Sequence, residues 1–165
     1  MDEDVSDPGS KTYSVKARAP AELTKEELVA CAVIIKKGEA VDLHSAEKEL
    51  PQAGVVVVAR KGRRIVGVGA IKRVRRAYAA SISQNSGATF PTETRELGYV
   101  AVDPDHQGHG LSHRILATLL SEYDGRLFAT TSNDRMKRTL SEAGFVKKGK
   151  EWKGRTAHLS FWEKM

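Results

Sequence analysis

The chain has 165 residues, of which 40% are hydrophobic and 29% are charged, a composition that is typical of one globular domain and excludes a largely disordered chain. No apolar run approaches the roughly 18 residues of a membrane-spanning helix. The single cysteine, Cys31, excludes an intrachain disulfide and a thiolate metal cluster. The formal net charge is +6. We therefore expect a soluble, cytoplasmic protein without a membrane partner.

The start of the chain is acidic, whereas the remainder is strongly basic. Asp2, Glu3, Asp4 and Asp7 stand near the start, and without these carboxylates the net charge is about +10. We expect residues 1–12 to be a disordered acidic tail without a secretory signal, followed by a single domain over 13–165. Basic clusters favour a polyanionic partner, either nucleic acid or a phosphate-rich cofactor, or they only keep the surface soluble. They stand at residues 60–64, 72–76, 135–138 and 147–155.

The first regular element is predicted to be a helix over residues 24–38. Thr24 and Glu27 have the spacing of a capping box, in which each side chain accepts a backbone N–H of the other residue. Gly38 is a helix stop signal, because glycine favours the left-handed conformation that follows a helix. Apolar residues recur on one face between these two signals, which indicates an amphipathic helix.

A short helix and a β-hairpin are predicted next. The helix is expected over residues 45–50, and Pro51 ends it. The hairpin strands are expected over 55–60 and 64–74, and the β-branched run of the first is typical of a central strand buried on both faces. The polar stretch that follows can extend the second strand before it becomes a loop over 83–92. A loop of that length is more often functional than idle.

The second half of the chain alternates between strands and helices. We expect a strand over 95–102, a helix over 111–123, a strand over 126–132, a helix over 133–145 and a terminal hairpin that turns at 153–155. Ser132 or Asn133 can cap the second helix, and Gly144 with Phe145 is typical of its end. This order predicts an α/β (α+β mixed) fold, with a twisted mixed sheet of six to seven strands flanked by about four helices.

Gly108 and Gly110 stand where a predicted strand leads into a predicted helix. They mark either a tight turn alone or an anion site. The first N–H groups of a helix lack intrahelical acceptors and lie at the positive end of the helix dipole, so a pyrophosphate could approach them there. A Walker loop is excluded, because Leu111 and Ser112 follow Gly110. A Rossmann fingerprint is excluded, because His113 stands at the third glycine position.

The segment that begins at Gln107 and ends at Ser112, Gln-Gly-His-Gly-Leu-Ser, resembles the pyrophosphate loop of the GNAT superfamily, the acyl-CoA-dependent N-acyltransferases. That loop reads Gln/Arg-x-x-Gly-x-Gly/Ala, so Ser112 departs from it conservatively. The preceding strand with Pro104, the later Asn133 and the Ser-Glu-Ala-Gly-Phe end of the last helix are also similar to the family. The resemblance covers roughly residues 55–162 and implies a GNAT-like sheet.

The resemblance implies an acetyl-CoA site and no metal ion. The implied cofactor-binding residues are Val100, Ala101, Val102, Gln107, Gly108, His109, Gly110, Leu111, Ser112 and Asn133. The N–H of Val102 is implied as the donor to the thioester carbonyl oxygen. Arg114, Arg135 and Arg138 are candidates for the remaining phosphate.

The chemistry also needs a base and an acid. A primary amine arrives protonated, with a pKa of about 10.4, and Glu96 stands where several family members carry a glutamate that acts as general base. Alternatively, Glu96 is a surface carboxylate at the start of the strand, or a partner of Arg95 or of another nearby arginine. Glu93 is the weaker substitute as base. Leu140 stands where the family often has a tyrosine acid. Ser141, Ser132, Tyr78 or water stay open as proton donors.

The histidines and the cysteine have simpler interpretations. His106, His109 and His113 lack a metal-ligand spacing, so we expect no metal site. Cys31 falls beside the apolar face of the first helix, where buried packing is favoured over a role as nucleophile.

Together these features imply an N-acyltransferase that moves an acetyl group from acetyl-CoA to a primary amine by direct attack in a ternary complex. Residues 13–165 would then be a single N-acetyltransferase domain. The acceptor can be a small amine, a protein amine or an aminoacyl-tRNA. The preferred acyl chain length also stays open, and a homodimer is possible. Two other classes also stay open. One is a non-catalytic acyl-CoA sensor, and the other is a basic nucleic-acid-binding module whose glycine turn grips backbone phosphates.

Overall fold

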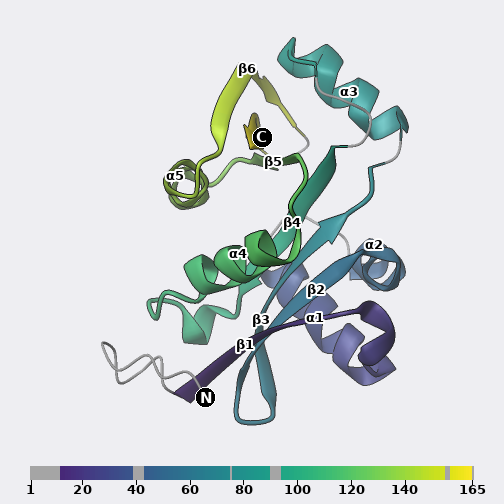
Figure 1. Cartoon of the computed structure of the whole chain (residues 1–165), viewed down its shortest axis with the longest axis vertical. Coiled ribbons are helices and arrows are strands. Elements are labelled where there is room, and N and C mark those ends of the chain that lie inside the picture. Colours follow the sequence, from purple (N-terminus) through teal and green to yellow (C-terminus); the bar gives the residue numbers. More distant parts are fainter. Residues whose placement is uncertain (1–11, 39–42, 75, 90–93, 155–156, 165) are drawn as a thin grey trace. The chain divides into compact units, whose positions relative to one another are not determined.

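The structure is a computed structural model that describes residues 12–38, 43–74, 76–89, 94–154 and 157–164 (Figure 1). The acidic tail, apart from residue 12, lies outside the described residues. The described chain forms two compact units. The first contains the residues up to Ile71 and Tyr99–Tyr123, and the second contains Lys72–Gly98 and the residues from Asp124 onward.

The described residues form seven strands and five α-helices. In chain order these are β1 (Tyr13–Arg18), α1 (Lys25–Gly38), α2 (Leu43–Glu49), β2 (Val55–Lys61), β3 (Arg64–Lys72), α3 (Arg76–Ser86), β4 (Arg95–Val102), α4 (Leu111–Glu122), β5 (Leu127–Thr131), α5 (Asp134–Glu142), β6 (Val146–Lys153) and β7 (His158–Lys164). The strands follow the sheet order β1-β2-β3-β4-β5-β7-β6. The β4–β5 pair is parallel, whereas β1–β2, β2–β3, β5–β7 and β6–β7 are antiparallel. The predicted mixed α/β fold is therefore confirmed.

In the first unit, β2 is buried on both faces, as its sequence predicts. Val56 and Val58 pack in one core cluster with Cys31 and Ile35 of α1 and with Ala46 of α2. The helix α4 packs against β1 and β2 (Figure 1). The unit thus places helices on both sides of its strands, which explains the continuous apolar run of β2.

Two glycines of β3 let α4 approach closely. A Cβ atom at Gly69 would lie 2.6 Å from Ile115 Cγ2 and 3.0 Å from Leu119 Cδ1. A Cβ atom at Gly67 would lie 3.0 Å from Ile115 Cδ1. Side chains here would push the helix outward, since packed interiors leave no room for an extra methyl group. These glycines therefore help to set how closely α4 lies against β3.

In the second unit, the start of β4 pairs with β5, and β5, β7 and β6 continue the sheet. The helix α3 packs on β6 and β7. Ile82 of α3 forms a core cluster with Phe128 and Phe161, whose ring centroids are 5.6 Å apart. Gly149 lies against the end of α3, because a Cβ atom there would be 2.3 Å from the carbonyl oxygen of Ser86. The expected turn of the terminal hairpin falls partly on residues 155–156, outside the described residues.

Local signals predict several helix ends correctly. The Thr24 N–H donates to Glu27 Oε1 at 2.7 Å and the Glu27 N–H donates to Thr24 Oγ1 at 3.1 Å, which confirms the capping box. Asn133 caps α5, because its Oδ1 accepts the Met136 N–H at 2.9 Å. Gly144 has a φ of 99°, as the predicted helix end requires.

Two elements differ from expectation. Residues 76–86 form the helix α3 rather than a strand extension and a loop. Their alanines favour a helix, but only Ile82 and Ser86 are buried in it, so the apolar periodicity is weak. Residues 13–18 form β1, which lies at one end of the sheet order and is mostly half-buried or exposed, so no clear apolar pattern marks it. Part of the expected loop, 90–93, lies outside the described residues.

Candidate active site

The strand β4 contains a backbone conformation that large residues rarely adopt. Tyr99 has a φ of 58°, in the left-handed region, although it lies inside a strand. Its ring is buried, and its hydroxyl donates a hydrogen bond to Glu49 Oε1 at 3.1 Å. Such strain costs roughly 1–3 kcal/mol and clusters at functional sites. Tyr99 divides β4 into a segment with Glu96 and a segment with residues 100–102.

A short turn follows β4 and is organised by Asp103. The Asp103 N–H donates to the Val66 carbonyl oxygen at 2.8 Å, and the buried Asp103 carboxylate accepts the Asp105 N–H at 3.0 Å. Lys37 and Arg64 place their charges 3.7 and 3.8 Å from the same carboxylate. The bond from Asp105 and the charges of Lys37 and Arg64 hold the pKa of Asp103 below its ordinary value, although burial acts in the opposite direction.

The predicted loop, residues 107–112, has the backbone of an open glycine turn. Gly108 and Gly110 have φ values of 89° and 72°, and a Cβ atom on either would meet no atom within 4 Å. The Gln107 amide donates to the Val102 carbonyl oxygen at 3.3 Å, which ties the loop to the end of β4.

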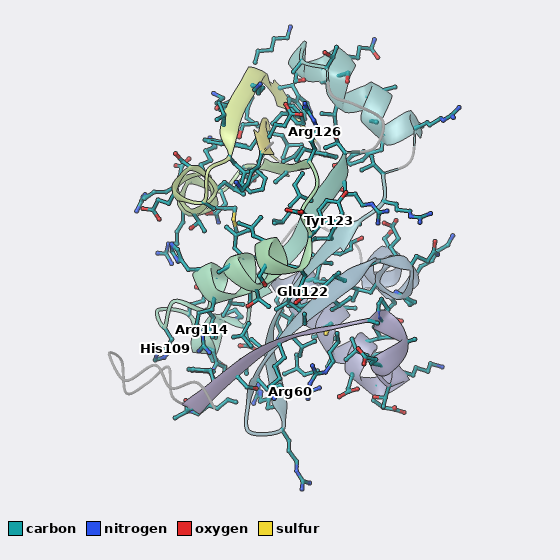
Figure 2. All side chains as sticks on the ribbon, viewed as in Figure 1. Arg60, His109, Arg114, Glu122, Tyr123 and Arg126 are labelled. Atoms are coloured by element: carbon teal, nitrogen blue, oxygen red, sulfur yellow. The ribbon has the colours of Figure 1, made fainter. Side chains whose placement is uncertain are left out.

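The loop leads directly into α4. Gly110 is the N-cap of α4, and Leu111 anchors its first turn in the core. The backbone N–H groups of that turn have no intrahelical acceptors, so an anion could approach them past the two glycines. Figure 2 shows His109 on this loop and Arg114 in the first turn of α4.

Glu96 is buried and paired rather than a surface carboxylate. It is 7% exposed, and its Oε1 lies 3.4 Å from the Nζ of Lys72, at the end of β3. Gly98 makes room for this pair, because a Cβ atom there would lie 3.2 Å from Lys72 Cε and 3.7 Å from Glu96 Cδ. Lys72 thus supplies an opposite charge beside the buried Glu96 carboxylate.

The remaining predicted residues lie in the second unit. Asn133 uses its oxygen to cap α5, which leaves its amide NH₂ as the group that could donate to a ligand. Leu140 is fully buried and packs as an aliphatic core residue. Of the alternative proton donors, Ser132, Ser141 and Tyr78 are all exposed. The first unit thus brings together residues 100–102 and 107–112, while Glu96 and Asn133 belong to the second.

Comparison with known proteins identifies the family. A family model described as the acetyltransferase (GNAT) family matches residues 21–145. The chain belongs to the GNAT acetyltransferase family. Family membership implies acyl transfer from acyl-CoA. A sequence comparison with curated proteins finds no significant match.

Solved structures show the same GNAT fold. A GNAT acetyltransferase from Streptococcus agalactiae is 13% identical with a TM-score of 0.70, and the match covers 92% of this chain and 95% of that one. YncA from Salmonella typhimurium, solved with its cofactor acetyl-CoA, is 20% identical with a TM-score of 0.63, over 91% and 92% of the chains. The ribosomal-protein-alanine N-acetyltransferase of Brucella melitensis is also 20% identical, with a TM-score of 0.64 over 91% and 99%. At these identities the likeness concerns the fold.

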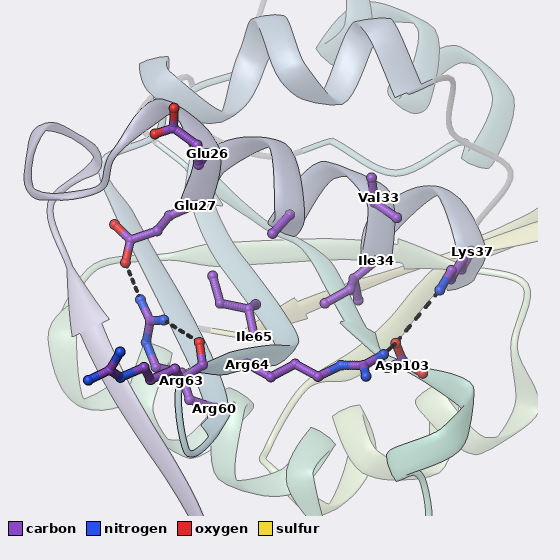
Figure 3. A pocket seen from close by; sticks show the side chains of 11 residues that line it. Glu26, Glu27, Val33, Ile34, Lys37, Arg60, Arg63, Arg64, Ile65 and Asp103 are labelled. Atoms are coloured by element: carbon purple, nitrogen blue, oxygen red, sulfur yellow. Dashed lines mark hydrogen bonds and ion pairs between the residues drawn. The ribbon is translucent and has the colours of Figure 1, made fainter.

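A pocket of this GNAT chain is lined by none of the predicted cofactor residues. It has a volume of about 450 Å³ and is lined by α1, the β2–β3 hairpin and Asp103. Figure 3 shows the Glu27–Arg60 pair at one end, and Lys37 reaching toward Asp103 at the other. Its apolar lining consists of Ala30, Val33, Ile34 and Ile65. Among the described residues that line it, Asp103 belongs to the turn that precedes the loop.

Three other features of the GNAT chain concern its cysteine, its metal-binding residue types and its helices. Cys31 is fully buried, as predicted, and burial raises the pKa of its thiol to about 12, which disfavours the reactive thiolate. Within the described ranges, no three His, Cys, Asp or Glu side chains gather as a metal site would require. None of the described helices is both long enough and apolar enough to span a membrane.

Four residues that organise the described parts of the two units were not identified from the sequence. Tyr99 and Lys72 act through contacts with residues distant in the chain, and so does Tyr13, which is hydrogen-bonded to His106. Only Asp103 had a local signal, because an aspartate directly before a proline is typical of a capped turn.

Proposed function

We propose that this chain is an acetyl-CoA-dependent N-acetyltransferase that transfers an acetyl group to a primary amine in a ternary complex. The observation that carries the proposal is the loop at residues 107–112. Its two glycines are left-handed and open on their Cα side, and they precede the first turn of α4. Such a helix start suits the pyrophosphate of coenzyme A.

The other contacts follow the order of the groups along acetyl-CoA. The backbone of residues 100–102 would pair with the pantetheine arm, as a strand pairs with its neighbour. The strand β4 pairs with β5 at Arg95 and Glu96, which lie earlier in the strand than residues 100–102. The Asn133 amide would donate to the pantetheine, and Arg114, Arg135 and Arg138 are candidates for the remaining phosphate. The proposed site needs no metal ion.

The reaction needs one bond to form and one to break. The neutral amine nitrogen attacks the thioester carbonyl carbon, and the Val102 N–H is the proposed donor to the developing oxyanion. The C–S bond then breaks, so that the amide and the coenzyme A thiolate separate. Because Leu140 has no proton to donate, the thiolate takes its proton from water or a nearby hydroxyl.

Glu96 is the proposed general base, directly or through a water molecule. The acceptor arrives as an ammonium with a pKa of about 10.4 and must lose a proton before it attacks. Glu96 carries the carboxylate that would accept this proton, and the Nζ of Lys72 lies 3.4 Å from its Oε1.

The acceptor is a small amine, a protein amine or an aminoacyl-tRNA. We propose that the protein acts in the cytoplasm, with residues 13–165 as one domain. The family match across residues 21–145, which runs through both compact units, supports the single domain.

The test measures thiol release from acetyl-CoA across a panel of these three acceptor classes. With an active acceptor, Glu96→Gln is expected to lower kcat about 100-fold or more, because a general base contributes at least that much. The fall of kcat at acidic pH, where Glu96 becomes protonated, should be lost in the variant. The affinity for acetyl-CoA should stay the same.

Glu122→Gln on α4 is the matched control, because it removes the same charge from an exposed position. It should leave kcat and its pH profile unchanged. An unaltered pH profile in Glu96→Gln would remove Glu96 as the base. Binding of acetyl-CoA without thiol release on any amine would instead favour a non-catalytic acyl-CoA sensor.

A further inference from the structure

Tyr13, the first residue of β1, contacts the loop region from a distant part of the chain. It is 7% exposed and pairs with Lys61 of β2 across the sheet. Its hydroxyl oxygen and His106 Nδ1 lie 3.0 Å apart and share a hydrogen bond, although 93 positions separate the two residues. The Tyr13 ring meets the His106 ring edge-to-face, with centroids 5.8 Å apart, and lies 5.3 Å from the His109 ring.

The two histidines stand on either side of Gln107 and Gly108, at the start of the predicted loop. His106 ends the short turn that Asp103 caps. His109 lies between the two left-handed glycines, which have no Cβ atoms to pack. The ring of Tyr13 therefore gives this glycine segment a side-chain contact with the sheet.

The ring is itself held firmly in place. Tyr13 pairs with β2, and the Nζ of Lys61 lies 5.9 Å from its ring centroid, within the range of a cation–π contact. The helix α4, which starts directly after the loop, also packs against β1. Tyr13 thus joins the loop to the strand that supports the next helix.

Glycine segments lose more conformational entropy on ordering than other residues do. A ligand that must order such a segment binds more weakly than one that meets it already ordered. The contacts of Tyr13 with His106 and His109 restrict the loop from both sides of Gly108 before any ligand is present.

We propose that Tyr13 is a positioning residue for the pyrophosphate loop, acting through His106 and His109. This rests on the proposed function, in which residues 107–112 hold the pyrophosphate of acetyl-CoA. Tyr13 then affects the affinity for the pyrophosphate and not that for the thioester arm. If Tyr13 only completed the sheet, its loss would not affect the affinity for the pyrophosphate more than that for the thioester arm.

The test compares dissociation constants, measured by calorimetry, for acetyl-CoA and for S-acetylpantetheine, which lacks the pyrophosphate. Tyr13→Phe keeps the ring and loses the hydrogen bond, so it should weaken acetyl-CoA binding about fivefold. Tyr13→Ala also loses the ring contacts and should weaken it about 30-fold. Both variants should bind S-acetylpantetheine as the wild type does. Because Tyr13→Phe keeps the buried ring, it carries the test even if Tyr13→Ala fails to fold.

Two glycine variants distinguish a failure of the Tyr13 role from a failure of the pyrophosphate loop itself. Gly110→Ala places a side chain at a left-handed position in the loop, and Gly62→Ala does the same in the β2–β3 turn, with open space at both sites. Only Gly110→Ala should weaken acetyl-CoA binding. If it does so but the Tyr13 variants do not, or if they weaken both ligands equally, the role of Tyr13 is overturned. If Gly110→Ala has no effect, the proposed loop function fails, and the role of Tyr13 fails with it.

Discussion

Asp103 joins three parts of the first unit through one buried carboxylate. It accepts the N–H of Asp105 in the turn, and it faces Lys37 of α1 and Arg64 of β3. Its capping bond belongs to the turn directly before the loop, so it helps to place Gln107 and the glycines. The sequence could predict the cap from an aspartate followed by proline, but the two cations come from distant elements.

The charge of Asp103 makes the stability of this unit dependent on pH. Its folded pKa lies below the ordinary value of 3.8, so its contribution is full above that pH and is lost as the pH falls through the folded pKa. Asp103→Asn keeps an oxygen for the Asp105 N–H and loses the charge. We expect it to be about 1 kcal/mol less stable at neutral pH, a modest loss because Lys37 and Arg64 are half-exposed or more.

Urea unfolding across pH measures this difference. The wild type and Asp103→Asn should converge as the pH falls through the folded pKa of Asp103, where the carboxylate becomes protonated. Asp103→Ala, which also loses the capping bond, should stay less stable than the wild type at both ends of the range. A gap between wild type and Asp103→Asn that does not change with pH would show that the charge is not the cause.

At the scale of elements, local patterns predict a helix or strand well where its own residues carry a clear apolar periodicity and end signals. The strand β4 and the helices α4 and α5 follow from apolar periodicity with end signals such as Asn133 and Gly144. The helix α3 and the strand β1 do not, because each buries few of its residues. The same division applies to the site. The loop was predicted because Gly108 and Gly110 stand in one short segment of the sequence, whereas Tyr13 reaches that segment only through the fold. Lys72 likewise reaches Glu96 only through the fold.

The approach of α4 to β3 depends on the absence of a side chain at Gly69. A Cβ atom there would lie 2.6 Å from Ile115 Cγ2, so Gly69→Ala must move the helix or the strand. Overpacking of this kind costs about 1–3 kcal/mol. Ile115→Ala removes the obstructing group, and the cost of Gly69→Ala should therefore be much smaller in that background.

A double-mutant cycle by urea unfolding measures this coupling. Gly62→Ala is a useful contrast, because it strains a left-handed backbone without creating a contact, and its cost should not depend on Ile115. Strictly additive costs for Gly69→Ala and Ile115→Ala would mean that the close approach of α4 is not maintained by Gly69.

At the scale of the whole molecule, the family match and the division into compact units describe the chain differently. The match over residues 21–145 begins in the first unit and ends in the second. The strand β4 also contributes to both, since the boundary falls after Gly98. A chain whose central strand serves both units is expected to unfold as one domain, in a single cooperative transition.

Acetyl-CoA should therefore raise the midpoint of that single transition. A ligand at 100 times its dissociation constant stabilises the folded state by about 2.7 kcal/mol, which for a chain of this size corresponds to a shift of about 5–11 °C. Scanning calorimetry with acetyl-CoA and longer acyl-CoAs measures the shift and shows which acyl length the site prefers. Gly110→Ala should lessen the shift, whereas Gly62→Ala should keep it. Two transitions, of which only one responds to acetyl-CoA, would contradict the single domain, and no shift with any acyl-CoA at saturation would contradict the proposed co-substrate.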